Sequence, residues 1–222
     1  DCTPNVLELR DLLLAKSQYT LVKLSPMLDW RKEVADFDGT VREVHIVATG
    51  NECKELLLVL GQQVHEEPSA PRVFCVNDNQ RIDYDSAAYT QGLRIGGKPL
   101  PEAKNYLYEP NASIMKAGCF DLVEERFGVT QVGPSSHLFV SATPVADFPG
   151  RGFAIESIGG MNKKDIKRLL NGTKQANIAV RNFPLTAPQL RKKLKLADGG
   201  PVYLFGTTMQ GCDHVLLRTS KI

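Results

Sequence analysis

Hydrophobic residues in the first sixty positions switch between helical and strand-like spacing. Val6, Leu9 and Leu13 recur every three or four residues after Thr3-Pro4, which predicts a helix to about residue 16 with Thr3 as its N-cap. The other predicted elements are a strand at 19–24, a short helix at 28–37, and strands at 41–47 and 56–60. The turn Thr49-Gly50-Asn51 lies between the last two strands, so we expect them to pair as an antiparallel hairpin.

The middle of the chain has weaker patterns. Residues 62–70 are polar and end near two prolines, which is typical of a linker, and residues 92–101 are loop-like. Two short strand-like runs between them, 72–76 and 81–84, flank a polar turn and predict a second hairpin.

One helix is predicted from Asn111, its N-cap, to a stop at Gly128. Its apolar face consists of Met115, Cys119, Leu122 and Val123. Strand-like residues lie on both sides, at 106–108 and 137–141. This strand, helix, strand unit has the size of a ferredoxin-like domain.

The last seventy residues have the clearest pattern. Asn162 predicts the N-cap of a helix with Ile166, Leu169 and Leu170 on its apolar face. Thr186 and Gln189 form a capping box, so a second helix should run to about residue 196. Strands are predicted at 153–157, 178–180, 202–207 and 214–219, the last two as a hairpin.

Composition indicates a globular protein without a membrane segment. The 222 residues, 42% of them hydrophobic, suffice for one large domain or two to three small ones. No run of eighteen apolar residues and no secretory signal is present, so we expect a cytoplasmic protein. The five cysteines lack metal-ligand spacing, which argues against a disulfide framework and structural zinc. Because the chain opens on Asp1 and its first helix begins at once, we expect a fragment of a longer protein.

The modest net charge of +2 conceals a division of charge along the chain. Residues 1–150 carry 14 Lys and Arg against 21 Asp and Glu, a net charge of −7, whereas residues 151–222 carry 13 against 4, a net charge of +9. A basic segment of this kind indicates a polyanionic partner, and nucleic acid is the commonest in the cytoplasm. The alternative is that lysines simply solvate a small domain.

The basic residues of this segment form two helical clusters and one isolated position. On a period of 3.6 residues, the first cluster is a continuous stripe opposite the apolar face of its helix, which is a phosphate-tracking arrangement. Arg181 ends the intervening strand, where its guanidinium could grip a phosphate bidentately. The predicted nucleic-acid-binding residues are Lys163, Lys164, Lys167, Arg168, Arg181, Arg191, Lys192, Lys193 and Lys195.

Other chemistry has little support in the sequence. Cys119 with His137 as its base could be proposed as a nucleophile, but Cys119 lies on an apolar helix face, where packing is the more common role. His45 and His214 have no partner at ligand spacing, so we expect no metal site. Asp29 follows the end of a predicted strand, where α/β sheets place ligands, although a lone carboxylate is a weak signal. No GxGxxG or P-loop motif is present.

Three stretches of the chain resemble a known family. They are Leu21-Val-Lys-Leu-Ser-Pro-Met-Leu-Asp29 with Asn51-Glu-Cys-Lys-Glu-Leu56, then Tyr108-Glu-Pro-Asn-Ala-Ser-Ile-Met-Lys-Ala-Gly118, then Ala176-Asn-Ile-Ala-Val-Arg-Asn-Phe-Pro184. In these stretches the chain resembles bacterial class I S-adenosylmethionine-dependent methyltransferases that end in a THUMP-like domain. The resemblance implies an α/β and α+β fold class: the C-terminal portion of a Rossmann-like methyltransferase sheet at 1–62, a linker and β-hairpin at 63–104, a ferredoxin-like domain at 105–150 and a THUMP-like α+β domain at 151–222.

The resemblance also implies what the fragment lacks. The glycine-rich cofactor loop and the motif that faces the methyl acceptor should lie upstream of Asp1, so the catalytic residues are unknown. S-adenosylmethionine is expected as the cofactor of the parent enzyme, with none bound by this fragment, which alone should be inactive. Ser25 and Asp29 are expected at the rim of the missing site.

The sequence thus supports two functional hypotheses. In the first, the parent enzyme transfers a methyl group from S-adenosylmethionine to RNA, with tRNA and rRNA as candidate substrates, and the basic segment presents that RNA. In the second, the chain is a non-catalytic module that binds a protein or ribosomal surface. Neither hypothesis requires a membrane or a metal.

Overall fold

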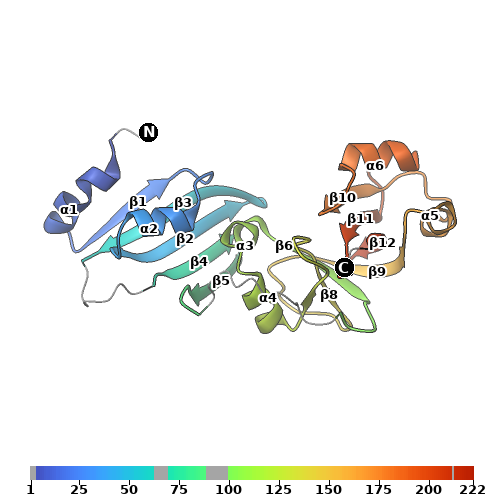
Figure 1. Ribbon diagram of the computed structural model, residues 1–222, viewed down its shortest axis with the longest axis horizontal. Coiled ribbons are helices and arrows are strands. Elements are labelled where there is room, and N and C mark those ends of the chain that lie inside the picture. The colour runs from blue at the N-terminus through green and yellow to red at the C-terminus, as the bar shows by residue number, and fades with distance from the viewer. Residues whose placement is uncertain (1–3, 63–69, 89–99, 212) are drawn as a thin grey trace. The chain divides into compact units, whose positions relative to one another are not determined.

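The computed structural model describes residues 4–62, 70–88, 100–211 and 213–222 (Figure 1). They form two compact units: the first is Asp1–Gly92 with Asn111–Cys119, and the second is Leu93–Pro110 with Phe120–Ile222. Most of the predicted linker at 62–70 and of the predicted loop at 92–101 falls outside the described residues.

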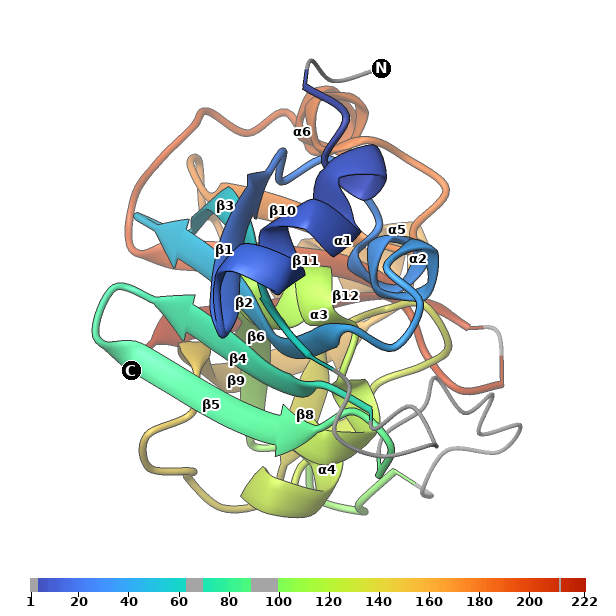
Figure 2. The ribbon, with the colours of Figure 1, turned by 90° about the vertical axis from the view of Figure 1, so that its left-hand side faces the viewer.

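The first unit is a five-stranded mixed sheet with helices (Figure 2). Its elements are α1 (Val6–Lys16), β1 (Tyr19–Leu24), α2 (Trp30–Asp36), β2 (Val41–Thr49), β3 (Glu52–Gly61), β4 (Arg72–Asn77), β5 (Gln80–Asp85) and α3 (Ala112–Ala117). The strand order is β1-β3-β2-β4-β5; β3 is antiparallel to both β1 and β2, while β4 is parallel to β2 and antiparallel to β5. The hairpin β4–β5 therefore extends the first sheet and is not a separate segment of structure.

Along part of each central strand every second residue is buried, and these residues form the core of this unit. Val44, Ile46 and Ala48 of β2 are buried, and so are Leu56, Leu58 and Leu60 of β3. Helices α2 and α3 are neighbours, because Trp30 Nε1 and Arg31 Nη2 both donate to the carbonyl oxygen of Ala117, at 3.4 and 2.9 Å. The indole of Trp30 is thus buried with its polar atom satisfied.

Two predictions about helix boundaries are wrong. Helix α1 has Asn5 as its N-cap, not Thr3, because the Asn5 side chain accepts a hydrogen bond from the backbone N–H of Leu7. The single helix predicted from Asn111 to Gly128 is two helices, α3 and α4 (Phe120–Phe127). Gly118 ends α3 with a φ of 67°, a left-handed conformation that glycine adopts without steric cost.

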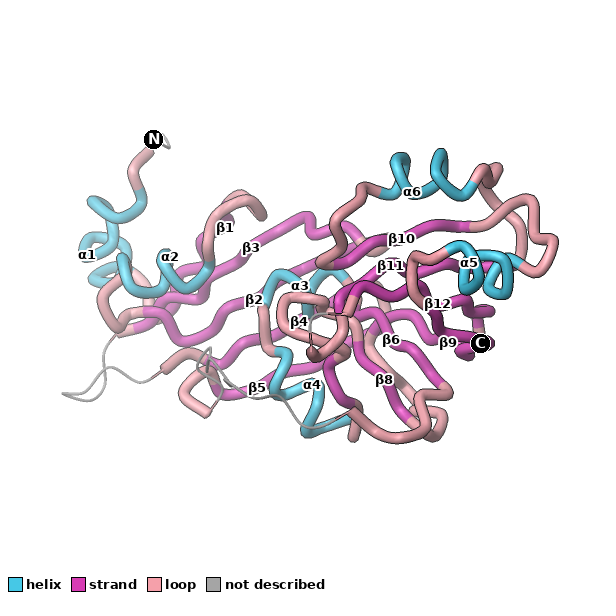
Figure 3. Tube along the Cα trace, turned by 45° about the vertical axis from the view of Figure 1, so that its right-hand side comes forward, coloured by secondary structure: helices cyan, strands magenta, loops and turns pink. Residues whose placement is uncertain are grey.

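The second unit is a seven-stranded sheet (Figure 3). Its elements besides α4 are β6 (Tyr106–Pro110), β7 (Thr130–Gln131), β8 (Phe139–Ser141), β9 (Gly150–Gly159), α5 (Lys163–Leu170), β10 (Asn177–Arg181), α6 (Ala187–Leu194), β11 (Val202–Thr208) and β12 (His214–Lys221). The strand order is β10-β11-β12-β9-β6-β8-β7, with β10 parallel to β11 and every other pair antiparallel.

Two cores lie on the two faces of this second sheet. Alternate residues of β11 and β12 point to opposite faces, so Leu204 and Leu216 pack under α5 and α6, whereas Phe205 and Leu217 pack with residues of β6 and β8. The sheet curls back on itself: Gln210 N donates to Val132 O at 2.9 Å, and Asn182 Nδ2 donates to Pro134 O at 2.8 Å. Strands distant in the sheet order are thereby brought together.

Candidate nucleic-acid interface

The predicted helix caps place the basic helices as expected. Asn162 caps α5 by accepting a hydrogen bond from Asp165 N, and Thr186 and Gln189 form the predicted capping box of α6. Leu169 of α5 and Leu190 and Leu194 of α6 are buried in one shared core. Because both helices bury their apolar sides against the same sheet face, their charged sides point to solvent.

Six lysines, five in α5 and α6 and one at the C-cap of α6, form the surface that we call the lysine surface. Its members are Lys163, Lys164, Lys167, Lys192, Lys193 and Lys195, and all six are exposed. In the described part of the chain, none of them makes an ion pair, so their charges are not neutralised by a protein carboxylate. The charges of this surface are therefore available to a partner.

The arginines that the sequence grouped with these lysines have structural partners. Arg168 donates to Ile158 O at 2.8 Å and pairs with Asp165. Arg191 donates to the carbonyl oxygens of Ala176 and Ala197, both at 3.0 Å. Arg191 also pairs with Asp198, so both arginines hold the fold as well as adding charge.

Asp165 lies within the lysine surface but is locally compensated. Its carboxylate accepts hydrogen bonds from the backbone N–H of Gly160 at 3.0 Å and from Asn162 Nδ2 at 2.8 Å, besides the pair with Arg168. The Gly160 bond foremost, and then the Arg168 and Asn162 bonds, hold the pKa of Asp165 below its usual value. Asp165 stays ionised at neutral pH, and the hydrogen bonds and ion pair that compensate its charge come from Gly160, Asn162 and Arg168.

Arg181 pairs with a buried carboxylate that the sequence patterns did not predict. Its Nη2 donates to Oε1 of Glu109 at 2.7 Å, and Arg151 pairs with the other oxygen of the same carboxylate. Glu109 comes from β6, 72 residues before Arg181, so no local pattern signals the contact. Arg181 thus has a carboxylate partner, whereas the six lysines with which the sequence grouped it have none in the described part of the chain.

Ser25 and Asp29 are both exposed at the carboxyl end of β1, where each has a local role. Ser25 Oγ accepts a hydrogen bond from Met27 N at 3.3 Å. Asp29 caps α2 by accepting from Arg31 N at 3.0 Å. Their place at the strand end agrees with a rim position, which stays a prediction.

The structure gives Cys119 and His137 different partners. Cys119 shares a hydrogen bond with Cys75, which lowers the pKa of Cys119 and, together with burial, raises the pKa of Cys75. His137 stacks on Phe120 with ring centroids 4.4 Å apart, and burial, with Arg181 adding to it, lowers the pKa of His137. This arrangement does not support a cysteine nucleophile with a histidine base.

In the described part of the chain, the other two histidines do not lie in a metal-ligand cluster. His45 stacks on Phe74 and contacts Glu43, while His214 contacts Thr208. Within residues 4–62, 70–88, 100–211 and 213–222, no three His, Cys, Asp or Glu side chains converge as metal ligands would.

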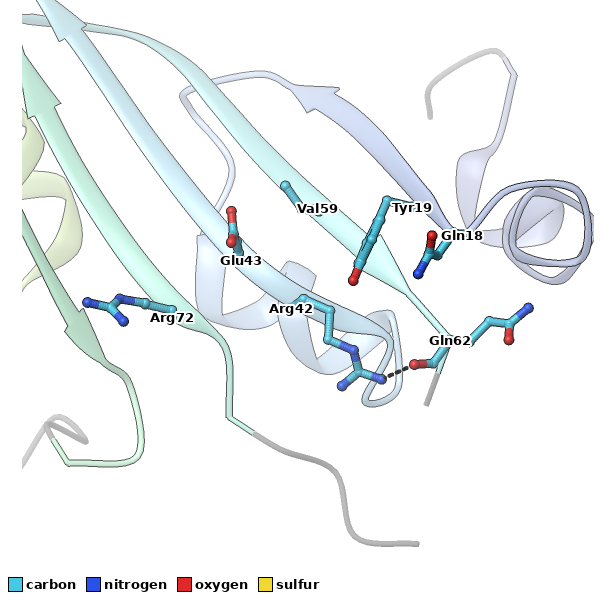
Figure 4. A pocket seen from close by; sticks show the side chains of 7 residues that line it. All are labelled: Gln18, Tyr19, Arg42, Glu43, Val59, Gln62 and Arg72. Carbon is cyan, nitrogen blue, oxygen red and sulfur yellow. Dashed lines mark hydrogen bonds between the residues drawn. The ribbon is translucent and has the colours of Figure 1, made fainter. Parts of the chain in front are cut away.

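A pocket of about 540 Å³ lies in the first unit (Figure 4). It is lined by Gln18, Tyr19, Arg42, Glu43, Val59, Gln62 and Arg72. Arg42 Nη2 donates to Gln62 O at 2.6 Å, which fixes one guanidinium at its edge. Its lining comes from β1, β2, β3 and β4 and from residues beside them, and it contains no serine, cysteine, threonine or histidine, so the geometry indicates no nucleophile–base pair of those residue types there.

The comparisons with known proteins match the second half of the chain to two domain families. Residues 106–149 match the model of a ferredoxin-like domain, and residues 150–221 match the model of a THUMP-like domain. The chain therefore carries a ferredoxin-like domain followed by a THUMP-like domain. Strand β9 of the THUMP-like domain pairs with β6 of the ferredoxin-like domain, so the two domains share one sheet.

A solved structure is similar over the whole chain. It is the crystal structure of a putative methyltransferase from Porphyromonas gingivalis W83, which is 33% identical with a TM-score of 0.88. The match covers 100% of this chain and 55% of that one, so the chain spans about half the length of its structural relative. The predicted fold class is confirmed, and so is the predicted resemblance in these respects: a ferredoxin-like domain, a THUMP-like domain and similarity to a putative bacterial methyltransferase. None of the curated proteins matches the chain.

No helix in the described part of the chain is long and apolar enough to cross a membrane.

Proposed function

We propose that this chain is the RNA-holding part of an S-adenosylmethionine-dependent RNA methyltransferase. The observation that carries the proposal is the lysine surface of the THUMP-like domain. Its six exposed cations have no carboxylate counter-ion among the described residues, while the neighbouring arginines are used within the fold. Lysines arranged in this way contact phosphates without reading bases, because an ammonium is a point charge on a flexible stem. Such a surface holds a phosphate chain and leaves base selection to another site.

The methyltransferase part of the proposal draws on the first sheet and on the solved relative. Strand β1 is an edge strand, with β3 as its one neighbour in the described sheet. Exposed large hydrophobic side chains gather in this region, at Leu7, Leu12, Tyr19, Leu21 and Met27. An unpaired edge beside exposed apolar side chains is typical of a surface covered by further structure. We propose that this surface packs against the part of the methyltransferase that holds the cofactor.

We propose that S-adenosylmethionine is held outside the described residues of this chain. At the carboxyl end of β1, Ser25 and Asp29 already serve a turn and a helix cap. No glycine-rich turn leads from a strand into a helix in the described part of the first unit. When bound by the parent enzyme, the cofactor supplies the methyl group; the role proposed for this chain is to bind and orient the RNA.

A filter-binding titration of the chain with tRNA and with duplex DNA, at several salt concentrations, tests the proposal. If most of the six lysines contact phosphates, log K should fall with log salt at a slope of roughly −3 to −5. We expect tRNA to bind more tightly than duplex DNA. Absence of salt-dependent RNA affinity would contradict an RNA-holding role and favour a module that binds a protein surface.

A further inference from the structure

Two of the distinctive sequence segments meet at one ion pair in the second unit. Glu109 belongs to the segment 108–118 and Arg181 to the segment 176–184, and Arg181 Nη2 donates to Glu109 Oε1 at 2.7 Å. Arg151, which lies opposite Glu109 in the β6–β9 ladder, donates its Nε to Glu109 Oε2 at 3.0 Å and also pairs through its Nη2. One carboxylate of the ferredoxin-like domain thus holds two guanidiniums of the THUMP-like domain.

Burial is unequal among these three groups. The Glu109 side chain is 4% exposed, whereas those of Arg151 and Arg181 are 44% and 39% exposed. The carboxylate of Glu109 is therefore buried, and the guanidiniums of Arg151 and Arg181 are partly exposed to solvent. Two cations over one anion leave an excess of one positive charge, held in a fixed geometry by the buried partner.

The two arginines that pair with Glu109 have N–H groups that are not used in these ion pairs. Among the described residues, buried Arg181 Nε, which always carries a hydrogen, has no hydrogen-bond partner, and neither has buried His137 Nδ1, which carries a hydrogen in one of the two neutral tautomers. Burial lowers the pKa of His137, and the positive charge of Arg181 adds to this effect. A guanidinium has five N–H groups, so Arg151 also retains donors beyond those that face Glu109. A buried donor such as Arg181 Nε is rarely left without an acceptor in a folded protein, so this atom is a candidate to donate to a ligand oxygen.

We propose that Arg151, Arg181 and His137, with Glu109 as their positioning residue, form a binding site for one phosphate group of the RNA. We call these four residues the Glu109 cluster. The inference rests on the proposed RNA-holding function and adds a fixed anchor to it. The lysine surface attracts the phosphate chain by charge, whereas the cluster selects one phosphate by its fork geometry.

Replacing these arginines with lysine distinguishes bidentate binding of a phosphate from electrostatic attraction of RNA by positive charge alone. Arg151→Lys and Arg181→Lys each keep the positive charge and remove the planar fork. We expect each variant to bind a short single-stranded RNA about 5- to 20-fold more weakly than wild type in a fluorescence titration at 0.1 M salt. The matched control is Arg126→Lys, at an exposed arginine of α4, which should leave the affinity unchanged.

Glu109→Gln tests the positioning role, because charge and geometry predict opposite results. Removal of one negative charge should tighten RNA binding and steepen the salt slope if attraction alone matters. If Glu109 positions the guanidiniums, affinity should fall about 5-fold or more and the slope should become shallower by about one unit. A thermal melt of each variant confirms that it is folded.

A readout on the wild-type chain keeps the test independent of folding. On addition of the same RNA, the side-chain Nε–H NMR resonances of Arg151 and Arg181 should shift, and that of Arg126 should not. Oligonucleotides with and without a 5′-phosphate distinguish a terminal phosphate from one within the chain. Shifts confined to the 5′-phosphorylated RNA assign a terminal phosphate, and equal shifts assign an internal one.

The outcomes separate this inference from the function on which it rests. Two results together would overturn the Glu109 cluster as a phosphate site while leaving the lysine surface intact. They are RNA affinities of Arg151→Lys and Arg181→Lys equal to that of wild type, and Nε–H resonances of Arg151 and Arg181 that do not shift when RNA is added. Failure of the wild-type chain to bind any RNA would instead overturn the proposed function.

Discussion

Reversing the charge of Lys163, Lys164 and Lys167 to glutamate should lower the affinity of the chain for tRNA by at least about 100-fold at 0.1 M salt. Each lysine that releases one counterion contributes nearly one decade of affinity between 1 M and 0.1 M salt, so losing three such contacts removes two to three decades. All three lysines are exposed and have no ion pair within the described chain. The fold should remain, because the apolar side of α5 is untouched.

A triple variant of equal charge change provides the control. Lys23, Lys32 and Lys54 lie in the first unit and pair with Glu55, Asp36 and Glu52. Changing these three to glutamate alters the net charge of the chain by the same amount, and exposed pairs of this kind add little to stability. Equal losses of tRNA affinity in the two variants would show that overall charge, and not the lysine surface, governs binding.

Phe153→Ala should lower the free energy of unfolding of the second unit by about 3 to 5 kcal/mol. The Phe153 ring is fully buried and packs on Tyr203 and Phe205, with ring centroids at 5.1 and 4.9 Å. It lies on β9, the strand that joins the ferredoxin-like and THUMP-like domains in one sheet. Urea unfolding followed by circular dichroism and by the exchange of backbone amides measures the effect.

The two domains should lose stability together in that experiment. Amides of β6 and of β11 are expected to show the same drop in protection, because both strands border the core that contains Phe153. Phe153→Leu keeps most of the volume and should cost less than about 1.5 kcal/mol. Loss of protection in β11 alone, with β6 unchanged, would show that the domains unfold independently.

Local patterns in the sequence predicted most of the secondary structure. The hairpins of the first unit, α5 with Asn162 as its N-cap, and α6 with its capping box all depend on residues within a few positions of one another. The break between α3 and α4 was missed because the apolar spacing continues across Gly118. A glycine inside a periodic segment is compatible with either a continuous helix or a stop, and tertiary packing decides between them.

Local sequence patterns could not predict the order of the strands in each sheet or the partners of the ion pairs. The placement of β4 beside β2, and the single sheet shared by the ferredoxin-like and THUMP-like domains, depend on contacts between residues far apart in the chain. The same reason explains why the lysine surface was predicted but the Glu109 cluster was not. Helical spacing places the lysines on one side, whereas no spacing rule relates Glu109 to Arg151 and Arg181.

Acetylation of lysines in the presence and absence of bound tRNA tests the RNA-holding role of the lysine surface most directly. Each lysine of α5 and α6, together with Lys195, should become protected from the reagent when tRNA binds, while Lys23 and Lys54 of the first unit should react as before. Protection spread evenly over the chain, or confined to the first unit, would contradict the account.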